Sequence, residues 1–385
     1  MGEFVNVCSG VNLSNIPHTD DIDAVLTNVP AAGKSESAAR NIVNLAVKTE
    51  AKYLYLDSGG FEIFKAIQNK ETICFDLDKP LFIDGKLNIT PRQIYEVGKI
   101  IRPTHFISLD YPIPKDDVNR HELNYRLTMG FNVMCARETA FYVNQYNFEM
   151  EDDAKFYIAL QCYNLTQMKN FLDNLETIDY DGISIPQRVH TPASLALFLF
   201  HIYRRFRKNK LPDIHLLGST RFSYLAILAY FAKNFFNFIS VDATSWSISS
   251  QQYLYLQPLD LRATAIGDAA KLNQFQMECD CPICLRYDYL DDLKGQNEYY
   301  KREMLYGHNW YVINQAKKSF YDNAGSNDDL NRYLLSVIDQ SSGKRKDEVA
   351  EIYRTLALIE TINKHIEDDT MVNHFSKMIA LDHSR

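Results

Sequence analysis

Three cysteines lie within six residues in the last third of the chain, and a histidine follows 24 residues later: Cys279, Cys281, Cys284 and His308. Three thiolates and one imidazole are a ligand set that tetrahedral Zn²⁺ takes, and four protein ligands leave no coordination position open for catalysis. The pattern therefore predicts a structural zinc site. Spacing alone does not single out the histidine, because the chain also contains His190, His201, His215 and His374. The alternative for the cysteines is a chance cluster of small core residues.

A second set of residues shares a position relative to short apolar runs. Asp57, Asp110 and Asp242 each stand at the end of such a run, and Gln161 and Gly218 hold the same place in two others. If the runs are parallel strands of a barrel, their carboxyl ends meet at one mouth, where barrel enzymes carry their active sites. Three carboxylates and an amide at that mouth predict a reaction centre. Each aspartate taken singly could also be a helix N-cap or a turn residue.

The strands that would position these residues are eight apolar runs rich in β-branched and aromatic residues, which alternate with helix-like segments. The runs are Phe4–Cys8, Ala24–Val29, Tyr53–Asp57, Phe106–Asp110, Phe156–Cys162, Gly182–Pro186, Ile214–Gly218 and Phe238–Ala243. Continuous apolar strands separated by amphipathic segments indicate a parallel sheet covered by helices. Eight strands within about 245 residues suit a closed barrel better than an open sheet. The predicted fold class is therefore α/β, a (β/α)₈ TIM barrel.

Helices are predicted between the runs and again in the last third of the chain. They are Thr90–Ile101, Thr166–Leu175, Thr191–Arg207, Arg221–Asn234, Glu298–Phe320, Leu330–Asp339 and Lys346–Asp368. The first begins with Thr90 as N-cap and Pro91 at the first helical position. The alternation stops after Ala243, and residues 247–285 indicate an irregular or β-rich insertion. We predict a barrel over 1–246, a zinc-binding subdomain with a closing helix over 247–320, and a helical C-terminal extension over 321–385, with a loop at 323–329.

Composition sets limits on location and partners. The chain has 385 residues, of which 46% are hydrophobic and 23% charged, as in an ordinary soluble protein. It contains neither a run of about 20 apolar residues nor a secretion signal. The lack of such an apolar run predicts no membrane partner. Seven cysteines without a disulfide-like spacing favour a reducing, cytoplasmic setting. The net charge of −8 argues against nucleic acid bound over the whole surface but leaves room for a local basic strip.

Two further motifs have competing interpretations. The densest basic run, Arg204–Lys210, could contact phosphates, or it could be a solvated helix C-terminus whose cations complement the helix dipole. The run Ala32–Ser35 is similar to the end of a phosphate-binding loop. That motif needs a glycine five residues before Gly33, where this chain has Asn28, so an ATPase is disfavoured.

The segment Asp57-Ser58-Gly59-Gly60-Phe61 resembles the Asp-Ser-Gly-Gly-aromatic signature of the tRNA-guanine transglycosylase superfamily. The cysteine and histidine pattern resembles the zinc site of that family, including an asparagine directly after the histidine, here His308-Asn309. The other strand ends occur in the family's order: Ser108-Leu109-Asp110, Leu160-Gln161, Asp181-Gly182, Leu217-Gly218 and Ser240-Val241-Asp242. The similarity spans roughly residues 4–320, and the Asp-Ser-Gly-Gly block together with the zinc pattern is its specific part.

The resemblance implies a pentosyltransferase that exchanges guanine in a nucleic acid for a 7-deazaguanine. Asp242 would be the nucleophile that attacks C1′ and forms a covalent glycosyl-enzyme, following the double-displacement chemistry of retaining glycosidases. Asp57 would be the general acid and base that assists the departing guanine and deprotonates the incoming base. Because C1′ is out of reach inside a duplex, the target nucleotide would be flipped out or single-stranded.

The resemblance also implies which residues bind the base. Asp110 would accept hydrogen bonds from its Watson–Crick edge, Gln161 would address another polar edge, and Phe61 would stack on its face. Glycines allow close approach of the backbone to a ligand. The full substrate-binding set on this basis is Asp110, Gln161, Phe61, Ser58, Gly59, Gly60, Gln187 and Gly218.

Two loops depart from the tRNA enzymes. Those enzymes have a Gly-Gly-Leu run where this chain has Ile185-Pro186-Gln187-Arg188, and Pro186 has no N–H to offer the base. They also continue after the nucleophile with a Pro-Thr-Arg run and a basic loop, whereas residues 243–248 here are Ala-Thr-Ser-Trp-Ser-Ile. These departures favour the DNA-modifying branch of the superfamily, whose members insert a 7-deazaguanine such as 7-cyano-7-deazaguanine (preQ₀) into DNA.

The implied partners are therefore DNA in preference to tRNA, a free 7-deazaguanine base, and helper proteins that open the duplex. One alternative is a transglycosylase acting on tRNA. Another is a non-catalytic zinc-containing partner subunit, but such a subunit is expected to lack Asp242 or Asp57, and this chain has both.

Overall fold

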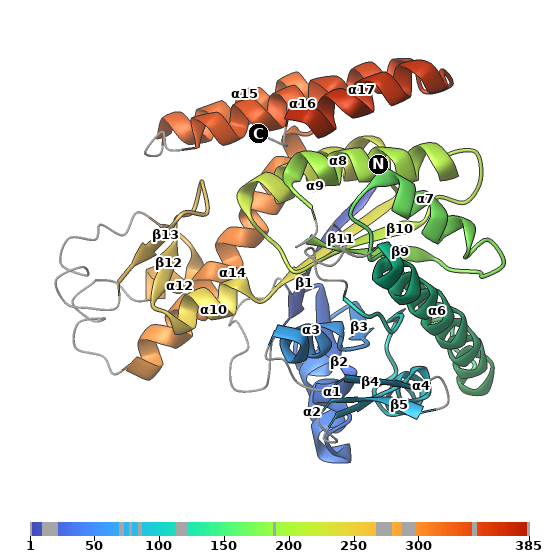
Figure 1. Cartoon of the computed structure of the whole chain (residues 1–385). Helices are drawn as coiled ribbons and strands as arrows, with labels where there is room; N and C mark the ends of the chain where they lie inside the picture. Colours follow the sequence, from blue (N-terminus) through green and yellow to red (C-terminus); the bar gives the residue numbers. More distant parts are fainter. Residues whose placement is uncertain are drawn as a thin grey trace.

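Eight parallel strands close into a barrel in the computed structural model (Figure 1). The structure describes residues 2–9, 22–68, 73–76, 79–83, 87–112, 122–187, 190–266, 279–286, 298–340 and 345–382. The barrel strands, in their order around the barrel, are β1 (Glu3–Ser9), β11 (Phe238–Ala243), β10 (Asp213–Leu217), β9 (Gly182–Pro186), β8 (Lys155–Ala159), β7 (His105–Ile107), β3 (Tyr53–Asp57) and β2 (Ala24–Asn28). The predicted (β/α)₈ class is thus confirmed.

Each of the eight apolar runs overlaps one barrel strand, but two runs extend three residues beyond the end of their strand. Strand β7 ends at Ile107 and β8 at Ala159, so Asp110 and Gln161 lie in the loops that follow. The ladder stops because the side chain of Ser108, rather than another backbone group, accepts the next N–H: Ser108 Oγ lies 2.9 Å from Ala159 N. Both polar residues remain on the face of the barrel to which the strand ends point.

Helices follow the barrel strands along the chain. They are α1 (Val29–Ala32), α2 (Glu36–Lys48), α3 (Gly60–Gln68), α4 (Pro91–Ile101), α6 (Glu122–Met150), α7 (Leu165–Asp173), α8 (Pro192–Phe206), α9 (Phe222–Asn234) and α10 (Ser245–Gln251). Helix α4 begins as predicted, with a capping box between Thr90 and Gln93 and proline in its first turn. In the segment similar to a phosphate-binding loop, Ser35 instead caps α2 through Ala38 N.

Two barrel connections hold elements that the sequence patterns did not predict. Between α3 and α4 lies a three-stranded antiparallel sheet of β4 (Ile73–Asp76), β5 (Lys79–Ile83) and β6 (Leu87–Ile89). Between β7 and β8 runs α6, which has 29 residues and packs against α4. Its apolar residues do not gather into one stripe, and this is why periodicity did not reveal it.

The region after the barrel is built around one long helix. It contains the hairpin of β12 (Leu254–Leu256) and β13 (Ala263–Ala265), the short helix α12 (Pro282–Arg286), and α14 (Glu298–Asn323). Helix α14 packs on α10, β12, α9 and β1, so it joins this region to the barrel. The predicted boundary at residue 320 falls inside α14, which runs three residues further.

The C-terminal extension consists of α15 (Asn327–Gln340), α16 (Lys346–Lys364) and α17 (Asp369–Asp382), which lie across α8 and α9 (Figure 1). The predicted loop at 323–329 is wrong in extent: α14 runs through Asn323 and α15 begins at Asn327. The hydroxyl of Ser326 accepts the N–H of Asp329 at 3.1 Å, so this polar run contains a helix start.

The extension also explains the basic run at the end of α8. Arg204 pairs with Asp369, while Arg207 and Lys208 share Glu367, and both acids belong to the extension. The remaining two cations of the run pair elsewhere: Arg205 with Asp173 and Glu176, and Lys210 with Asp181. The run is therefore neutralised within the chain. Among the described helices, none combines the length and apolar composition needed to cross a membrane.

Candidate functional site

The carboxylates predicted at strand ends gather at the carboxyl-terminal mouth of the barrel. Asp57 is the last residue of β3, Asp242 lies in β11, and Asp110 follows β7. The charges of Asp110 and Asp242 both act on the Asp57 carboxyl and raise its pKa. Three acids from three strands therefore lie close enough to influence one another electrostatically.

Asp57 is the acid whose protonation the site changes most. Burial of the carboxyl, the largest cause, and the charge of Asp110 together raise the pKa of Asp57 to about 8. A hydrogen bond opposes this shift, because Asp57 Oδ2 accepts the N–H of Gly59 at 3.1 Å. The side chain keeps some contact with the mouth, as it is only partly buried by accessible surface. At neutral pH Asp57 is therefore mainly protonated and can donate a proton.

Asp110 lies within a polar cluster that can read a ligand. Gln161 Nε2 donates to Asp110 Oδ2, and Ser58 Oγ lies 3.4 Å from Asp110 Oδ1. Asp110 is 4% exposed and Gln161 3% exposed, and Gln161 Oε1 has no hydrogen-bond partner within the described part of the chain. A buried acceptor without a donor carries a free-energy cost that a ligand N–H can relieve.

Gly60 shows how tightly this cluster is built. A Cβ added there would lie 2.4 Å from Asp110 Oδ1, so a larger residue would push the carboxylate out of place. The Gly-Gly pair after Ser58 thus lets the start of α3 approach Asp110. Phe61 is the next residue of α3, but its side chain lies outside the described part of the structure, so the predicted stacking role has no geometry to be compared with.

Asp242 is fixed by its neighbours on β10. The N–H of Gly218 donates to Asp242 Oδ1 at 3.0 Å and to its backbone oxygen at 3.1 Å. Gly218 has φ +93°, a conformation that residues with a Cβ rarely adopt. Asp242 is 7% exposed, so its carboxylate is held at the mouth with a small accessible surface.

A histidine that the sequence did not single out for this site lies directly below Asp242. His215 Nε2 lies 3.5 Å from Asp242 Oδ1, and His215 Nδ1 lies 2.8 Å from Ser240 Oγ. Tyr55 OH in turn donates to Ser240 Oγ at 3.1 Å. When Ser240 donates to Nδ1, the imidazole proton is on Nε2 and faces the carboxylate. The alternation of β10 could have found it, because His215 shares the inward face with Leu217.

These residues belong to a stack of rings that fills the barrel. The Tyr55 ring lies between His105, at a centroid distance of 4.3 Å, and His215, at 5.0 Å. Burial and the nearby charge of Lys155 lower the pKa of His105 to about 3, so this imidazole is neutral at physiological pH. The stack is a rigid floor under Asp242.

Gln187 is the predicted base-binding residue whose side chain turns away from the acids. Its Nε2 donates to Tyr224 OH at 2.7 Å, and Tyr224 OH donates to the backbone oxygen of His190. The amide therefore supports the start of α9. The mouth thus brings together Asp57, Ser58, Gly60, Asp110 and Gln161 in one linked group, and Gly218 with Asp242 in another.

The second candidate centre is the cysteine cluster with its histidine. Ligand atoms of Cys279, Cys281, Cys284 and His308 all lie within 4.8 Å of one another, and His308 Nδ1 is 3.7, 3.5 and 3.3 Å from the three sulfurs in that order. The structure thus selects His308 from the histidines that spacing left open. These four residues could hold a metal ion.

The side chains of His308 and Asn309 at this cluster have hydrogen-bond partners for their polar atoms. His308 Nε2 lies 2.8 Å from the backbone oxygen of Leu256, and the ring of Tyr255 stacks on the imidazole at 3.8 Å. Asn309 Oδ1 accepts the N–H of Leu256 at 3.0 Å, and Asn309 Nδ2 donates to Leu254 O and Ser250 Oγ. Such partners fix the tautomer and orientation of a metal-binding histidine. They also join α14 to β12 and α10.

Comparison with protein-family models and with curated proteins gives no match for this sequence. Its function is therefore argued from the residues and their geometry.

Proposed function

We propose that this chain is a nucleic-acid guanine transglycosylase that exchanges guanine in DNA for a 7-deazaguanine through a covalent aspartyl intermediate. The observation that carries the proposal is the convergence of Asp57, Asp110 and Asp242 at the mouth of a closed barrel, with different surroundings for each. Asp57 is kept protonated, Asp110 belongs to a buried recognition cluster, and Asp242 is held by Gly218 and His215.

The proposed reaction assigns one task to each acid. Asp242 Oδ attacks C1′ of the target nucleotide, a C1′–O bond forms, and the C1′–N9 bond to guanine breaks. Asp57 donates its proton to the departing base, and the electron pair of the broken bond stays with guanine. The incoming base then gives its proton to Asp57 and attacks C1′, which releases Asp242 with retention of configuration.

The recognition cluster supports a purine with N–H donors as the exchanged base. Guanine and 7-deazaguanines present adjacent N–H groups on the Watson–Crick edge, which suit the oxygens of Asp110 and Gln161 Oε1, the latter without a hydrogen-bond partner among the described residues. A base that lacked those donors would leave the Oε1 of Gln161 unsatisfied in a buried site, and the site would disfavour it.

We propose Zn²⁺ as the ion of the cysteine cluster. Tetrahedral zinc with three Cys and one His ligand places its nitrogen about 3.6 Å from each sulfur, given Zn–S of about 2.3 Å and Zn–N of about 2.0–2.1 Å. The observed distances of 3.3–3.7 Å fit that geometry. Its role is structural, because four protein ligands complete the coordination.

DNA is the favoured polymer because Pro186 and residues 243–248 depart from the segments with which the tRNA enzymes contact their substrate. The test supplies the purified chain with radiolabelled guanine and with single-stranded DNA, duplex DNA or tRNA. Label retained in DNA supports the proposal. Label in tRNA alone contradicts the DNA preference, and label in duplex DNA only after a helper protein is added identifies a need for strand opening. No label in any polymer, with or without cellular extract, contradicts the enzyme and favours a non-catalytic subunit.

A further inference from the structure

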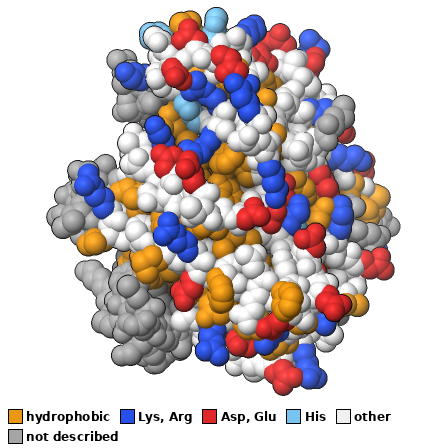
Figure 2. Space-filling view, turned by 90° about the vertical axis from the view of Figure 1, so that its right-hand side faces the viewer, with side chains coloured by type: hydrophobic (Ala, Val, Ile, Leu, Met, Phe, Trp, Pro, Cys, Tyr) orange, Lys and Arg blue, Asp and Glu red, His pale blue; other side chains and the backbone are white. Residues whose placement is uncertain are grey.

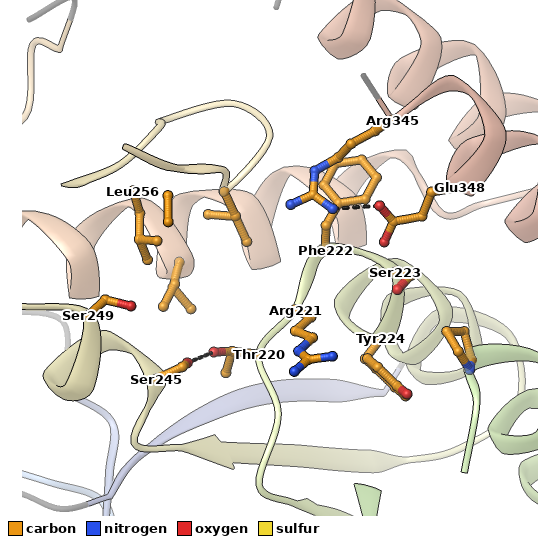
Figure 3. Close-up of a pocket in the computed structure, with 14 residues that line it drawn as sticks. Thr220, Arg221, Phe222, Ser223, Tyr224, Ser245, Ser249, Leu256, Arg345 and Glu348 are labelled. Carbon is orange, nitrogen blue, oxygen red and sulfur yellow. Dashed lines mark hydrogen bonds and ion pairs between the residues drawn. The ribbon is translucent and has the colours of Figure 1, made fainter. Parts of the chain in front are cut away.

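A cavity of about 520 Å³ lies where the barrel, the metal-binding region and the C-terminal extension meet (Figure 3). Its walls come from the loop between β10 and α9, the start of α9, α10, the β12–β13 hairpin and the start of α16. A site of this volume holds a small ligand or one segment of a larger one.

Arg221 provides the cavity with a positive charge that the chain does not neutralise. Its side chain is exposed, no acid within the described residues pairs with it, and its guanidinium projects into the space between Thr220 and Tyr224 (Figure 3). The second arginine of the wall, Arg345, is paired with Glu348 at 2.5 Å and lies over the ring of Phe222. The net charge of the described wall is therefore positive.

This charge stands out against the rest of the surface. On the face shown in Figure 2, basic and acidic side chains are mixed, without a broad patch of one sign. The densest basic run, at the end of α8, is paired with acids throughout. A polyanion is therefore expected to bind at a local positively charged site and not over a broad basic surface.

The start of α9 adds hydrogen-bond donors to the cavity. This 13-residue helix has Arg221 at the N-cap, with no side-chain cap, so the first backbone N–H groups have no side-chain acceptor. Ser223 is 5% exposed, lines the cavity and has no hydrogen-bond partner for its hydroxyl among the described residues. An uncapped helix start, the hydroxyl of a largely buried serine and a guanidinium together form a donor set that can bind a phosphate.

The cavity adjoins the loops that carry the proposed reaction. Gly218, which holds Asp242, is three residues before Arg221, and Thr220 Oγ1 lies 2.9 Å from Ser245 Oγ in the segment after β11. The phosphates of a nucleotide are attached to the same ribose whose C1′ would meet Asp242. A phosphate bound beside these two loops would thus belong to the reacting nucleotide or its neighbour.

We infer that this cavity binds a phosphodiester next to the target nucleotide, with the guanidinium of Arg221, the hydroxyl of Ser223 and the first N–H groups of α9 as its donors. The inference rests on the proposed function for the identity of the polymer. It makes the enzyme selective for a nucleotide within a chain over a free nucleoside, and it gives the C-terminal extension a part in the site, since Arg345 and Glu348 close one wall.

The first test measures binding of a fluorescent single-stranded oligonucleotide with one guanine, by anisotropy at several salt concentrations. Arg221→Ala should weaken binding about 10-fold and lower the slope of log K against log salt by about one. Arg40→Ala removes an equal charge from α2 and should leave both values unchanged. An Arg221→Ala variant that binds like wild type would overturn the inference.

A second measurement locates the phosphate. An oligonucleotide with uncharged methylphosphonate linkages on both sides of the guanine should bind wild type about 10-fold more weakly, and Arg221→Ala should show little further loss. If the methylphosphonate linkages weaken binding by the same factor in wild type and in Arg221→Ala, Arg221 does not contact these phosphates. Ser223→Asp provides an independent variant: it places an anion where the helix dipole favours one, so the fold should be kept while binding is lost.

These outcomes separate the inference from the proposed function. Arg221-dependent binding without base exchange in any polymer would leave the phosphate site standing and remove the transglycosylase. Base exchange in DNA, with binding that ignores Arg221 and Ser223, would do the reverse.

Discussion

The barrel mouth and the cysteine cluster are both groups of polar side chains, but they differ in what they leave unsatisfied. At the mouth, Gln161 Oε1 has no partner among the described residues, and Asp57 is held with a pKa of about 8. At the cluster, His308 and Asn309 have complete hydrogen bonds to the neighbouring strand. The contrast separates a site with an unsatisfied acceptor from a cluster whose residues are held in place and could hold a metal ion.

Replacing a metal ligand tests the second half of this contrast and should have the largest effect. Cys281→Ser should lower the metal content from about one ion per chain to near zero and should destabilise the region around α14, because metal binding and folding are coupled. Atomic absorption and thermal unfolding measure both. Cys135→Ser changes a buried thiol on α6 and should keep the metal. A Cys281→Ser protein with full metal content and unchanged unfolding would exclude the cluster as a structural centre.

Replacing Asp242, the proposed nucleophile, tests the role of the barrel mouth. Asp242→Asn keeps the size and the hydrogen bond from Gly218 but removes the nucleophilic oxygen, so base exchange should fall by about 10⁴-fold or more while metal content and melting temperature stay close to wild type. Asp213→Asn alters a carboxylate at the opposite end of β10 and should retain exchange. If the Asp242→Asn rate equals that of wild type, Asp242 is not the nucleophile.

The protonation of Asp57 gives a pH-dependent prediction in which activity and stability both fall as the pH rises. Exchange should decline as pH rises through about 8, where the general acid ionises. Because the folded-state pKa lies above the unfolded value, the folded protein binds the extra proton, and its stability should decrease from about pH 4 to pH 8.

Asp57→Asn removes this linkage. The variant should lose exchange yet exceed wild type in free energy of unfolding by on the order of 2 kcal/mol at pH 8, with little difference at pH 4. Denaturant titrations at the two pH values measure the change. A variant less stable than wild type at pH 8 would show that the carboxyl is not strained in the folded state.

A substitution in the ring stack below Asp242 should have the smallest effect on activity. His215→Phe keeps the stacking with Tyr55 but removes the contact to Asp242 Oδ1, so kcat should fall about 10-fold while KM for the free base stays constant. The rate of covalent-adduct formation in a single turnover should fall by the same factor. A change in KM alone would place His215 in base binding instead.

The sequence was informative where local pattern and tertiary structure agree. All eight barrel strands were predicted because buried parallel strands are continuous apolar runs. The three cysteines of the cluster were predicted because their spacing is a local property, whereas spacing alone did not single out His308. The floor of the site was not predicted. The alternation of β10 places His215 on the inward face, but His215 meets Asp242 only because β10 and β11 are neighbours in the barrel, which the local sequence does not show.

The same reasoning explains the other omissions. The basic run at 204–210 has acidic partners for Arg204, Arg207 and Lys208 that are more than 150 residues away in the sequence, so the sequence left a phosphate-binding surface open as one interpretation of the run. Arg221, alone in the sequence, keeps its charge because the structure brings no acid to it within the described residues. The density of basic residues along the sequence therefore does not show which positive charges are left without an acidic partner in the folded chain.

Helix α14 has a consequence for how the chain reaches its native state. Asn314 on this helix accepts a hydrogen bond from Asn6 in β1, 308 residues away, and Tyr321 bonds to the backbone of Gly2. Strand β1 also needs β11, which is made late, as its neighbour. Contacts of such sequence separation form slowly, so the first strand must wait as an open edge while most of the chain is synthesised. Closure of the barrel and packing of α14 against β1 are therefore expected as one late event in folding.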